Sequence, residues 1–262
     1  DLVLQADGAT IDETRFEDQQ GRGVRREANL NLSHESLAGN FANLNLSGAF
    51  GDSAGREISD RIVTSGDNYL RLFQDANDER EGEVSGDYEF GLGFGRLKLI
   101  GLQRLKVREP SSQTFSDYFG AQAATGSQYQ TESETGESIA RAEFSWFDAS
   151  DNDWQLSLEG AFNFLDTASE LATLSGDVFV DEPLTNATTR IEERRAESGI
   201  VHGRRITDSI VFQGSLGVEY SELTQSGAAG QVRDFVRPKG FASLSWQPLE
   251  TWDIAVRIER AG

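Results

Sequence analysis

The chain has 262 residues, of which 44 are acidic and 24 basic, giving a formal net charge of −20. This charge argues against a nucleic-acid partner, because the phosphates would be repelled. The absence of cysteine excludes disulfides and thiolate metal sites.

Hydropathy leaves a membrane protein open. No apolar run reaches the ~18 residues of a membrane-spanning helix. The mean hydropathy of −0.48 is compatible with a membrane β-barrel, in which only every second residue of a strand needs to be apolar. The chain has no methionine and no signal peptide, and residues 260–262 stand within an alternating strand, so we interpret it as a fragment.

In the first third of the chain, the alternation of apolar and polar residues becomes regular only gradually. Residues 1–22 form a lead-in segment, interpreted as the end of a plug domain or as a first strand, with a turn at 20–23. We predict a partial transmembrane β-barrel domain over residues 23–262. Its first strands are followed by a turn at 51–55 and a charged loop at 75–81.

Four later segments alternate apolar and polar residues on both sides of a turn. This period of two predicts antiparallel hairpins at the residue ranges 84–107, 138–164, 196–220 and 242–258. Longer connections are expected at 109–135, 166–188 and 221–231. Short turns on one rim and long loops on the other are typical of outer-membrane barrels.

The hairpin at 138–164 is the clearest of the four. Trp146 and Trp154 flank its turn on the apolar face, as in an aromatic girdle. Pairing them sets Phe144 against Leu156 and, on the other face, Arg141 against Glu159. The same pairing sets Ala142 against Leu158 on the apolar face, next to Phe144 and Leu156.

Two further hairpins are expected to follow the same rule. We predict Trp246 opposite Trp252, with Lys239 opposite Glu259. In the hairpin at 84–107, Leu92 should face Leu97, and Glu83 should face Lys106. The predicted fold is therefore all-β: an antiparallel meander of about 11 long strands, part of a transmembrane β-barrel, whose first and last strands do not pair in this chain.

The pattern resembles a known family. Arg237-Pro238-Lys239-Gly240-Phe241, Ser245-Trp246-Gln247-Pro248 and Trp252 form a strand, a short Pro-containing turn and a Trp at each foot. Together with the segment Ala140–Trp154 and its acidic turn, they resemble the barrel part of TonB-dependent outer-membrane receptors over residues 24–262.

The resemblance implies a specific function. It implies a 22-stranded barrel with a plugged lumen in the outer membrane of a Gram-negative bacterium. It also implies outer-membrane lipid as a partner and import of a scarce small-molecule ligand (siderophore, vitamin or oligosaccharide), driven by the TonB complex. The chain contains no TonB box and no plug domain, so the resemblance places contact with TonB in regions outside it.

Candidate site residues are few. His34 and His202 stand apart from any carboxylate cluster, and no helix follows Gly91–Gly95, so we expect no enzyme activity, cofactor or metal site. The candidates for ligand binding are aromatic residues of the longest connection, with packing of that loop as the alternative: Phe115, Tyr118, Phe119 and Tyr129. The expected aromatic girdle consists of Trp146, Trp154, Trp246 and Trp252.

Two other functions remain open. One is a passive porin or a structural or adhesive surface barrel. The other is a barrel enzyme, which the sequence favours less because it lacks a Ser/His/Asp constellation.

Overall fold

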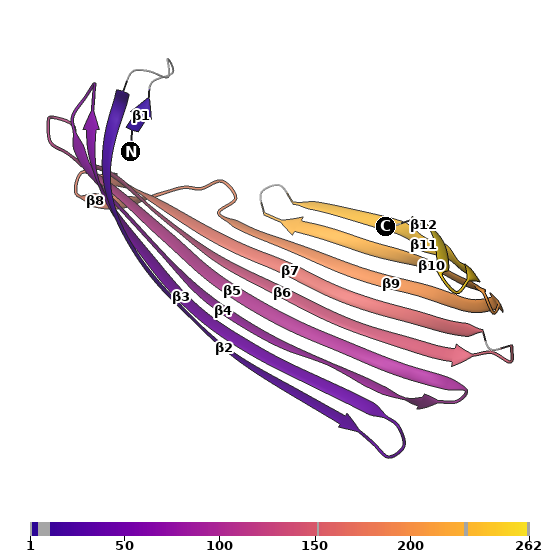
Figure 1. The fold of residues 1–262 in the computed structure, drawn as a ribbon. Helices are drawn as coiled ribbons and strands as arrows, with labels where there is room; N and C mark the ends of the chain where they lie inside the picture. The colour runs from indigo at the N-terminus through magenta and orange to yellow at the C-terminus, as the bar shows by residue number, and fades with distance from the viewer. Residues whose placement is uncertain (1, 5–10, 151, 228–229, 261–262) are drawn as a thin grey trace.

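The computed structural model describes residues 2–4, 11–150, 152–227 and 230–260, and these form one antiparallel sheet of 12 strands (Figure 1). The described part of the chain contains no helix long and apolar enough to cross a membrane. In chain order the strands are β1 (Leu2–Leu4), β2 (Ile11–Glu35), β3 (Phe41–Val63), β4 (Tyr69–Leu92), β5 (Gly95–Tyr118), β6 (Thr125–Phe147), β7 (Asp153–Ser175), β8 (Val178–Glu182), β9 (Thr188–Thr207), β10 (Ile210–Ser226), β11 (Gln231–Leu249) and β12 (Trp252–Arg260).

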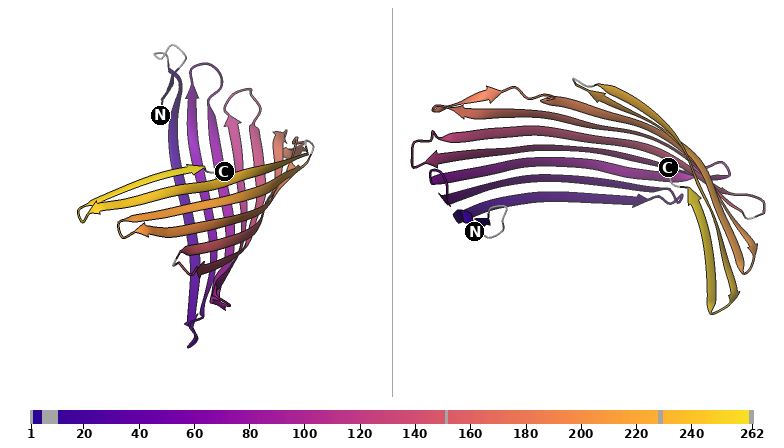
Figure 2. Two further views of the ribbon diagram at one scale, coloured as in Figure 1. Left: turned by 90° about the vertical axis from the view of Figure 1, so that its right-hand side faces the viewer. Right: turned by 90° about the horizontal axis from the view of Figure 1, so that it is seen from above.

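The topology is a meander. Each strand lies beside its neighbours in the chain, except that β9 follows β7 in the sheet while β8 pairs with β7 alone. β1 and β12 are the two ends of this path, so the sheet is open. It is also strongly twisted, and β9–β12 run across the direction of β2–β5 when the sheet is viewed from its end (Figure 2). The predicted meander of about 11 strands is confirmed.

The strands are much longer than the sequence pattern suggested. β3 has 23 residues and runs through the turn expected at 51–55. β4 has 24 residues and contains the expected charged loop at 75–81. β2 has 25 residues and includes both the turn expected at 20–23 and the expected domain boundary at 22/23. These turn and loop predictions were wrong because main-chain pairing continues where both faces of the strand are polar.

The long loops predicted from the sequence are also mostly strand. Only residues 119–124 separate β5 from β6, and only 227–230 separate β10 from β11. Between β7 and β9 the chain forms the short strand β8. At the opposite end of the sheet the connections at 93–94, 208–209 and 250–251 are two residues long, and those at 36–40 and 148–152 are five residues long. The two ends are called here the long-loop end and the short-turn end.

The register of the central hairpin is as predicted: Trp146 lies opposite Trp154, and Arg141 lies opposite Glu159. The other two predicted registers are wrong by two residues. Leu92 lies opposite Gly95 because the turn is tighter than expected, with Gly93 at a φ of 60°. Trp246 lies opposite Ile254.

These two-residue shifts change the ion pairs but keep every side chain on its predicted face. Glu83 lies opposite Arg104 instead of Lys106. Glu259 lies opposite Phe241 instead of Lys239.

The two faces of the sheet differ in chemistry. The belt face carries Phe144, Leu156 and Leu158, and the ladder face carries Arg141 and Glu159. A band of apolar residues, the belt, covers the belt face next to the short-turn end. In five of the strands it occupies residues 28–34, 82–92, 136–146, 196–202 and 252–258.

The belt has the dimensions of a bilayer. The 11 residues at 82–92 and at 136–146, at ~3.3 Å each and tilted by ~40°, span about 28 Å, close to the ~25 Å height of the lipid-facing band of an outer-membrane barrel. The seven residues that the belt occupies in each of the other three strands span about 18 Å. Along the observed registers the centre of the belt moves by about one residue per strand. With strands ~4.8 Å apart, this step corresponds to a tilt of about 35°, as in closed barrels.

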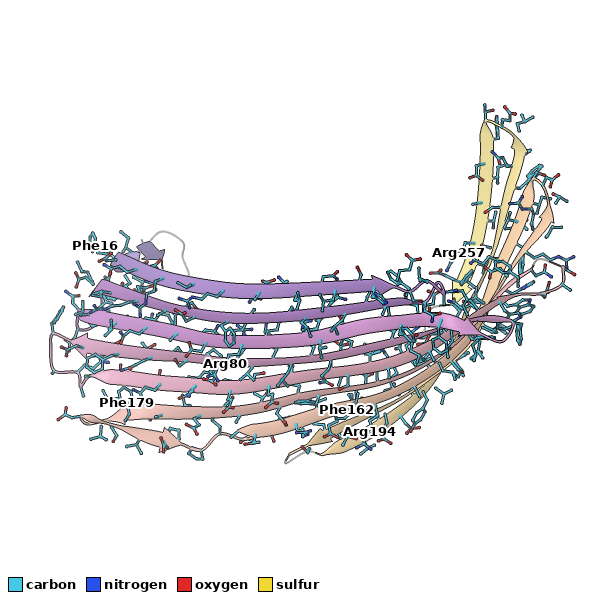
Figure 3. All side chains as sticks on the ribbon, turned by 90° about the horizontal axis from the view of Figure 1, so that it is seen from below. Phe16, Arg80, Phe162, Phe179, Arg194 and Arg257 are labelled. Atoms are coloured by element: carbon cyan, nitrogen blue, oxygen red, sulfur yellow. The ribbon has the colours of Figure 1, made fainter. Side chains whose placement is uncertain are left out.

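No packed core supports this single-layer sheet. Among the described residues the buried apolar side chains are those of Ala49, Ala161 and Ala172, whereas Leu158 is 55% and Leu216 74% exposed. Side chains project from both faces along its whole length (Figure 3). An exposed apolar area of this size requires a covering medium.

Candidate functional site

An aromatic row borders the belt at the short-turn end. Trp146 and Trp154 stack with ring centroids 6.1 Å apart and planes inclined by 7°. Phe94 contacts the edge of Trp146, and His202 lies over Trp154 with centroids 4.0 Å apart. Trp246 and Trp252 lie on the same face, 44% and 60% exposed.

The turn between β6 and β7 holds this row in place through Asp148. Its carboxylate accepts hydrogen bonds from the main-chain N–H of Ser150 (2.8 Å), from the Asn152 amide (2.8 Å) and from the Trp154 indole N–H (3.2 Å). The Asn152 side chain contributes most to holding the pKa of Asp148 well below its ordinary value. The ionised turn therefore fixes the indole of Trp154.

Ion pairs on the ladder face connect strands that are not adjacent. Arg25 of β2 reaches across β3 and places Nη1 2.8 Å from Oε1 of Glu79 on β4. It can do so because Gly51, opposite both residues, has no side chain. Lys239 of β11 likewise crosses β10 at Gly217.

Lys239 connects two carboxylates in this way. Its Nζ lies 2.8 Å from Oε2 of Glu197 on β9 and 2.5 Å from Oε2 of Glu219 on β10. Further ion pairs join neighbouring strands of the same face: Arg104–Glu81, Lys106–Glu79, Arg141–Glu159, Arg195–Glu159 and Arg237–Glu219.

A buried cation lies on the ladder face at the long-loop end. Arg61 is 3% exposed, and its guanidinium lies 2.8 Å from Glu13, 3.5 Å from Glu17 and 3.6 Å from Glu57. The Tyr69 hydroxyl donates to the second oxygen of Glu13 at 3.3 Å. These five side chains are called the Arg61 cluster.

Ionisation within this cluster is mutually supported. Burial opposes the ionisation of Glu13, but hydrogen bonds from Arg61 and Arg15 outweigh it, so the pKa of Glu13 lies below its ordinary value. Burial foremost, and then the Glu13 carboxylate, raises the pKa of Tyr69 above its ordinary value. Glu13 is therefore a carboxylate and Tyr69 a neutral hydrogen-bond donor near neutral pH.

The structure separates the four predicted ligand-binding aromatics. Tyr118 lies on the ladder face against Tyr69, with ring centroids 4.9 Å apart, and so joins the Arg61 cluster. Tyr129 lies on the same face farther along the sheet and donates to Ser169 at 3.2 Å. Phe119 follows β5 and is 68% exposed, and Phe115 lies on the belt face.

Sequence reasoning missed Arg61 and Tyr69. Both stand in segments of weak alternation, and only the pairing of β3, β4 and β5 brings them to Tyr118. No set of three His, Asp or Glu side chains in the described ranges is arranged to hold a metal ion.

No protein-family model matches the chain, and no curated protein matches it in sequence. Solved structures similar to it include FpvAI in its complex with pyocin S2, at 8% identity and a TM-score of 0.50, with 94% of this chain and 42% of that chain covered. They also include the copper transporter OprC (11% identity, TM-score 0.45, 98% and 48% covered). The ferric citrate transporter FecA is a third (11% identity, TM-score 0.37, 98% and 47% covered).

The chain thus spans less than half the length of each of these three proteins. At such low identity the similarity concerns the fold alone. It rests on FpvAI, which has the highest of the three TM-scores. The open meander, the tilted belt and the ion-paired opposite face agree with that likeness. In fold, the chain resembles a part of a β-barrel of the kind found in TonB-dependent outer-membrane receptors.

Proposed function

We propose that this chain is part of the wall of a transport barrel in the outer membrane of a Gram-negative bacterium. The observation that carries the proposal is the division of one continuous sheet into two chemical faces. The belt is exposed, apolar and about as tall as a bilayer, whereas the ladder face at the same level carries ion pairs such as Lys98–Asp87 and Arg141–Glu159. Lipid would cover the belt, and the ladder face would line a polar lumen.

The Arg61 cluster supports a ligand-binding role at the mouth of this barrel. It lies at the long-loop end, which in outer-membrane barrels faces the outside of the cell. Tyr69 and Tyr118 offer a pair of contacting aromatic rings, inclined by 37° to each other, beside a carboxylate-lined guanidinium. Phe119 and Tyr129, near the same rim, are further candidate contacts.

Energised import is the proposed mode of transport, with the TonB complex contacting regions outside this chain. The similar structures include proteins described as transporters of ferric citrate and of copper. We therefore expect a metal-bearing small molecule as the ligand. The alternative of a passive porin or adhesive barrel predicts passage or binding that does not need energy.

Uptake measurements on the complete polypeptide test this function. Cells producing it are given radiolabelled ferric citrate, other ferric chelates or copper, with and without a protonophore. Uptake above the level of cells lacking the protein, abolished by the protonophore, supports energised import. Uptake that continues without energy supports the porin, and no uptake of any probe contradicts the proposed ligand class.

A matched pair of variants tests the site. Tyr69→Ala with Tyr118→Ala should lower uptake at least severalfold, whereas Phe94→Ala, at the short-turn end, should leave it unchanged. Both proteins must reach the membrane in equal amounts. Equal uptake by the two variants would remove the Tyr pair from the ligand site.

A further inference from the structure

On the ladder face beside the Arg61 cluster, one arginine has no partner. Arg71 of β4 forms no ion pair and no hydrogen bond with any described residue, and its Nε atom is buried. Ser59 lies directly opposite Arg71 on β3, and its Oγ atom is likewise buried without a hydrogen-bond partner. Buried polar groups are nearly always hydrogen-bonded, so two neighbouring groups able to donate indicate that an acceptor is missing here.

The acids around Arg71 in the register are engaged elsewhere. Glu17 and Glu57 lie 3.5 Å and 3.6 Å from the guanidinium of Arg61. Asp75, the next acid along the ladder face of β4, is four residues away. The guanidinium of Arg71 therefore carries a positive charge that no carboxylate of the described residues neutralises by direct contact.

Toward β5, Arg71 borders a surface without charge. This surface, called the hydroxyl wall, consists of the ladder-face positions of residues 110–118, 125–135 and 165–175 on β5, β6 and β7. Each of these positions carries a hydroxyl group, except for one proline and two leucines, and Ser116 lies directly opposite Arg71. Hydroxyl groups can donate hydrogen bonds to an anion without bringing a charge of their own.

The strand next to Arg71 also favours the approach of an anion. β5 carries no acidic residue on the ladder face along its whole length, whereas its basic residues there include Arg104 and Lys106. The glutamates of the Arg61 cluster stand on β2 and β3, on the other side of Arg71. In a chain with a net charge of −20, the side of Arg71 toward β5 is thus free of acidic side chains on this face.

We infer that Arg71 and the hydroxyl wall bind a carboxylate group of an anionic ligand. The planar guanidinium offers a pair of N–H donors that matches the two oxygens of a carboxylate. One unpaired guanidinium balances the single charge of a carboxylate better than the charge of about −1.5 to −2 of a phosphate.

This inference rests on the proposed function and adds the charge of the ligand to it. The barrel would accept a metal chelate that bears carboxylates, in preference to a bare metal cation or a neutral chelate. Arg71 is the residue that sets this preference, because the other cations near it already have carboxylate partners.

Equilibrium binding to the complete polypeptide, purified in detergent, tests the inference. The probes are ferric citrate, ferric tartrate, a neutral ferric trihydroxamate, copper(II) ion and inorganic phosphate, and the two carboxylate chelates should bind most tightly. Arg71→Gln should weaken the binding of both carboxylate chelates at least about tenfold, the loss expected when a hydrogen bond to a charged group is removed. Arg71→Lys should restore part of this affinity, because the charge remains while the planar pair of donors is lost.

Arg205→Gln is the matched control. Arg205 is an exposed arginine of the ladder face at the short-turn end, and it too forms no ion pair with a described residue. Its variant loses the same charge and should leave binding unchanged. Equal weakening by the two variants, or unaltered carboxylate binding by Arg71→Gln, would overturn the inference. So would the absence of carboxylate binding by the parent, or tighter binding of phosphate, copper or the neutral chelate.

Unfolding titrations without ligand separate a ligand site from a structural ion pair. Arg71→Gln should be as stable as the parent, because no carboxylate of the protein loses its partner. A destabilised variant that binds the carboxylate chelates as tightly as the parent would show that Arg71 pairs with an acid outside residues 1–262. That result would also overturn the inference.

Uptake by the same variants distinguishes this inference from the proposed function. Energised uptake of a carboxylate chelate that falls with Arg71→Gln supports both. Equal energised uptake by the parent and by Arg71→Gln supports the transport function and overturns the carboxylate site. Weakened binding by Arg71→Gln, without energised uptake by the parent, supports the carboxylate site and contradicts the transport function.

Discussion

At the scale of single residues, the sheet depends on where side chains are missing as much as on where they are present. Gly51 and Gly217 let Arg25 and Lys239 reach carboxylates two strands away. Elsewhere a glycine is needed because a neighbouring strand comes close. A Cβ atom at Gly86 would lie 2.7 Å from the carbonyl oxygen of Asn43, whereas one at Gly101, directly opposite Gly86, would meet nothing within 4 Å.

This pair gives the first prediction. Gly86→Ala should destabilise the complete polypeptide by ~1–3 kcal/mol, because a rigid main-chain atom blocks the added methyl group. Gly101→Ala should be neutral, or stabilising by up to ~1 kcal/mol through the unfolded state. Urea titration of both variants in lipid vesicles measures the difference, and equal free energies of unfolding would contradict the close approach of β3 and β4.

The Arg61 cluster gives the second prediction. Arg61→Leu should cost ~3–5 kcal/mol at pH 8, because it leaves carboxylates without their buried cation. Glu13 has a lowered pKa in the folded state, so its contribution to stability is present above its ordinary pKa of ~4.3 and is lost as the pH falls through the lowered value. The gap between the parent and the variant should therefore narrow on acidification.

Unfolding titrations at pH 8 and at pH 4 measure this gap. Arg26→Gln serves as a control for charge, since exposed ion pairs contribute ~0–1 kcal/mol. A gap that stays constant or widens at pH 4 would show that Arg61 does not act through these carboxylates.

At the scale of the strand, one element carries three environments in succession. β7 begins at the aromatic row with Trp154, crosses the belt at Leu156 and Leu158, and continues to Glu170 beyond it. The change from apolar to polar along one face marks the limit of the belt. β-Pairing itself does not change there, because its hydrogen bonds belong to the main chain.

The position of the belt gives the third prediction. Leu158→Arg, near the middle of the belt, should destabilise the protein in lipid vesicles by ~2–4 kcal/mol. Glu170→Arg, on the same strand and face but outside the belt, should change the free energy of folding by less than ~0.5 kcal/mol. Folding of the Leu158 variant as well as the parent would show that this face does not meet lipid.

At the scale of the whole molecule, the sheet is curved, twisted and open. β12 pairs only with β11, and its residues Trp252–Arg260 are all exposed. An open edge leaves main-chain N–H and C=O groups without partners, and in hydrocarbon each such group costs several kcal/mol. In water, the belt would stay uncovered.

The fourth prediction concerns the chain by itself. Residues 1–262 alone, refolded into detergent or vesicles, should aggregate or remain digestible by protease. The main-chain groups of the open edge would lack hydrogen-bond partners, and no closed barrel would hold the belt in lipid. The complete polypeptide should give a monomer whose electrophoretic mobility changes on heating. A heat-modifiable, protease-resistant monomer formed by residues 1–262 alone would mean that β1 and β12 close into a cylinder.

The sequence alone determined the two faces and the register of the central hairpin. The period of two assigns each residue to a face, and the Trp146–Trp154 pair with its Asp148 turn fixes that hairpin locally. Tertiary structure decided the strand lengths, because polar segments such as 75–81 have no alternation and are held in strands by their neighbours. It also decided the charged clusters: Arg25 and Glu79 are 54 residues apart, and only the folded sheet shows that a glycine lies between them.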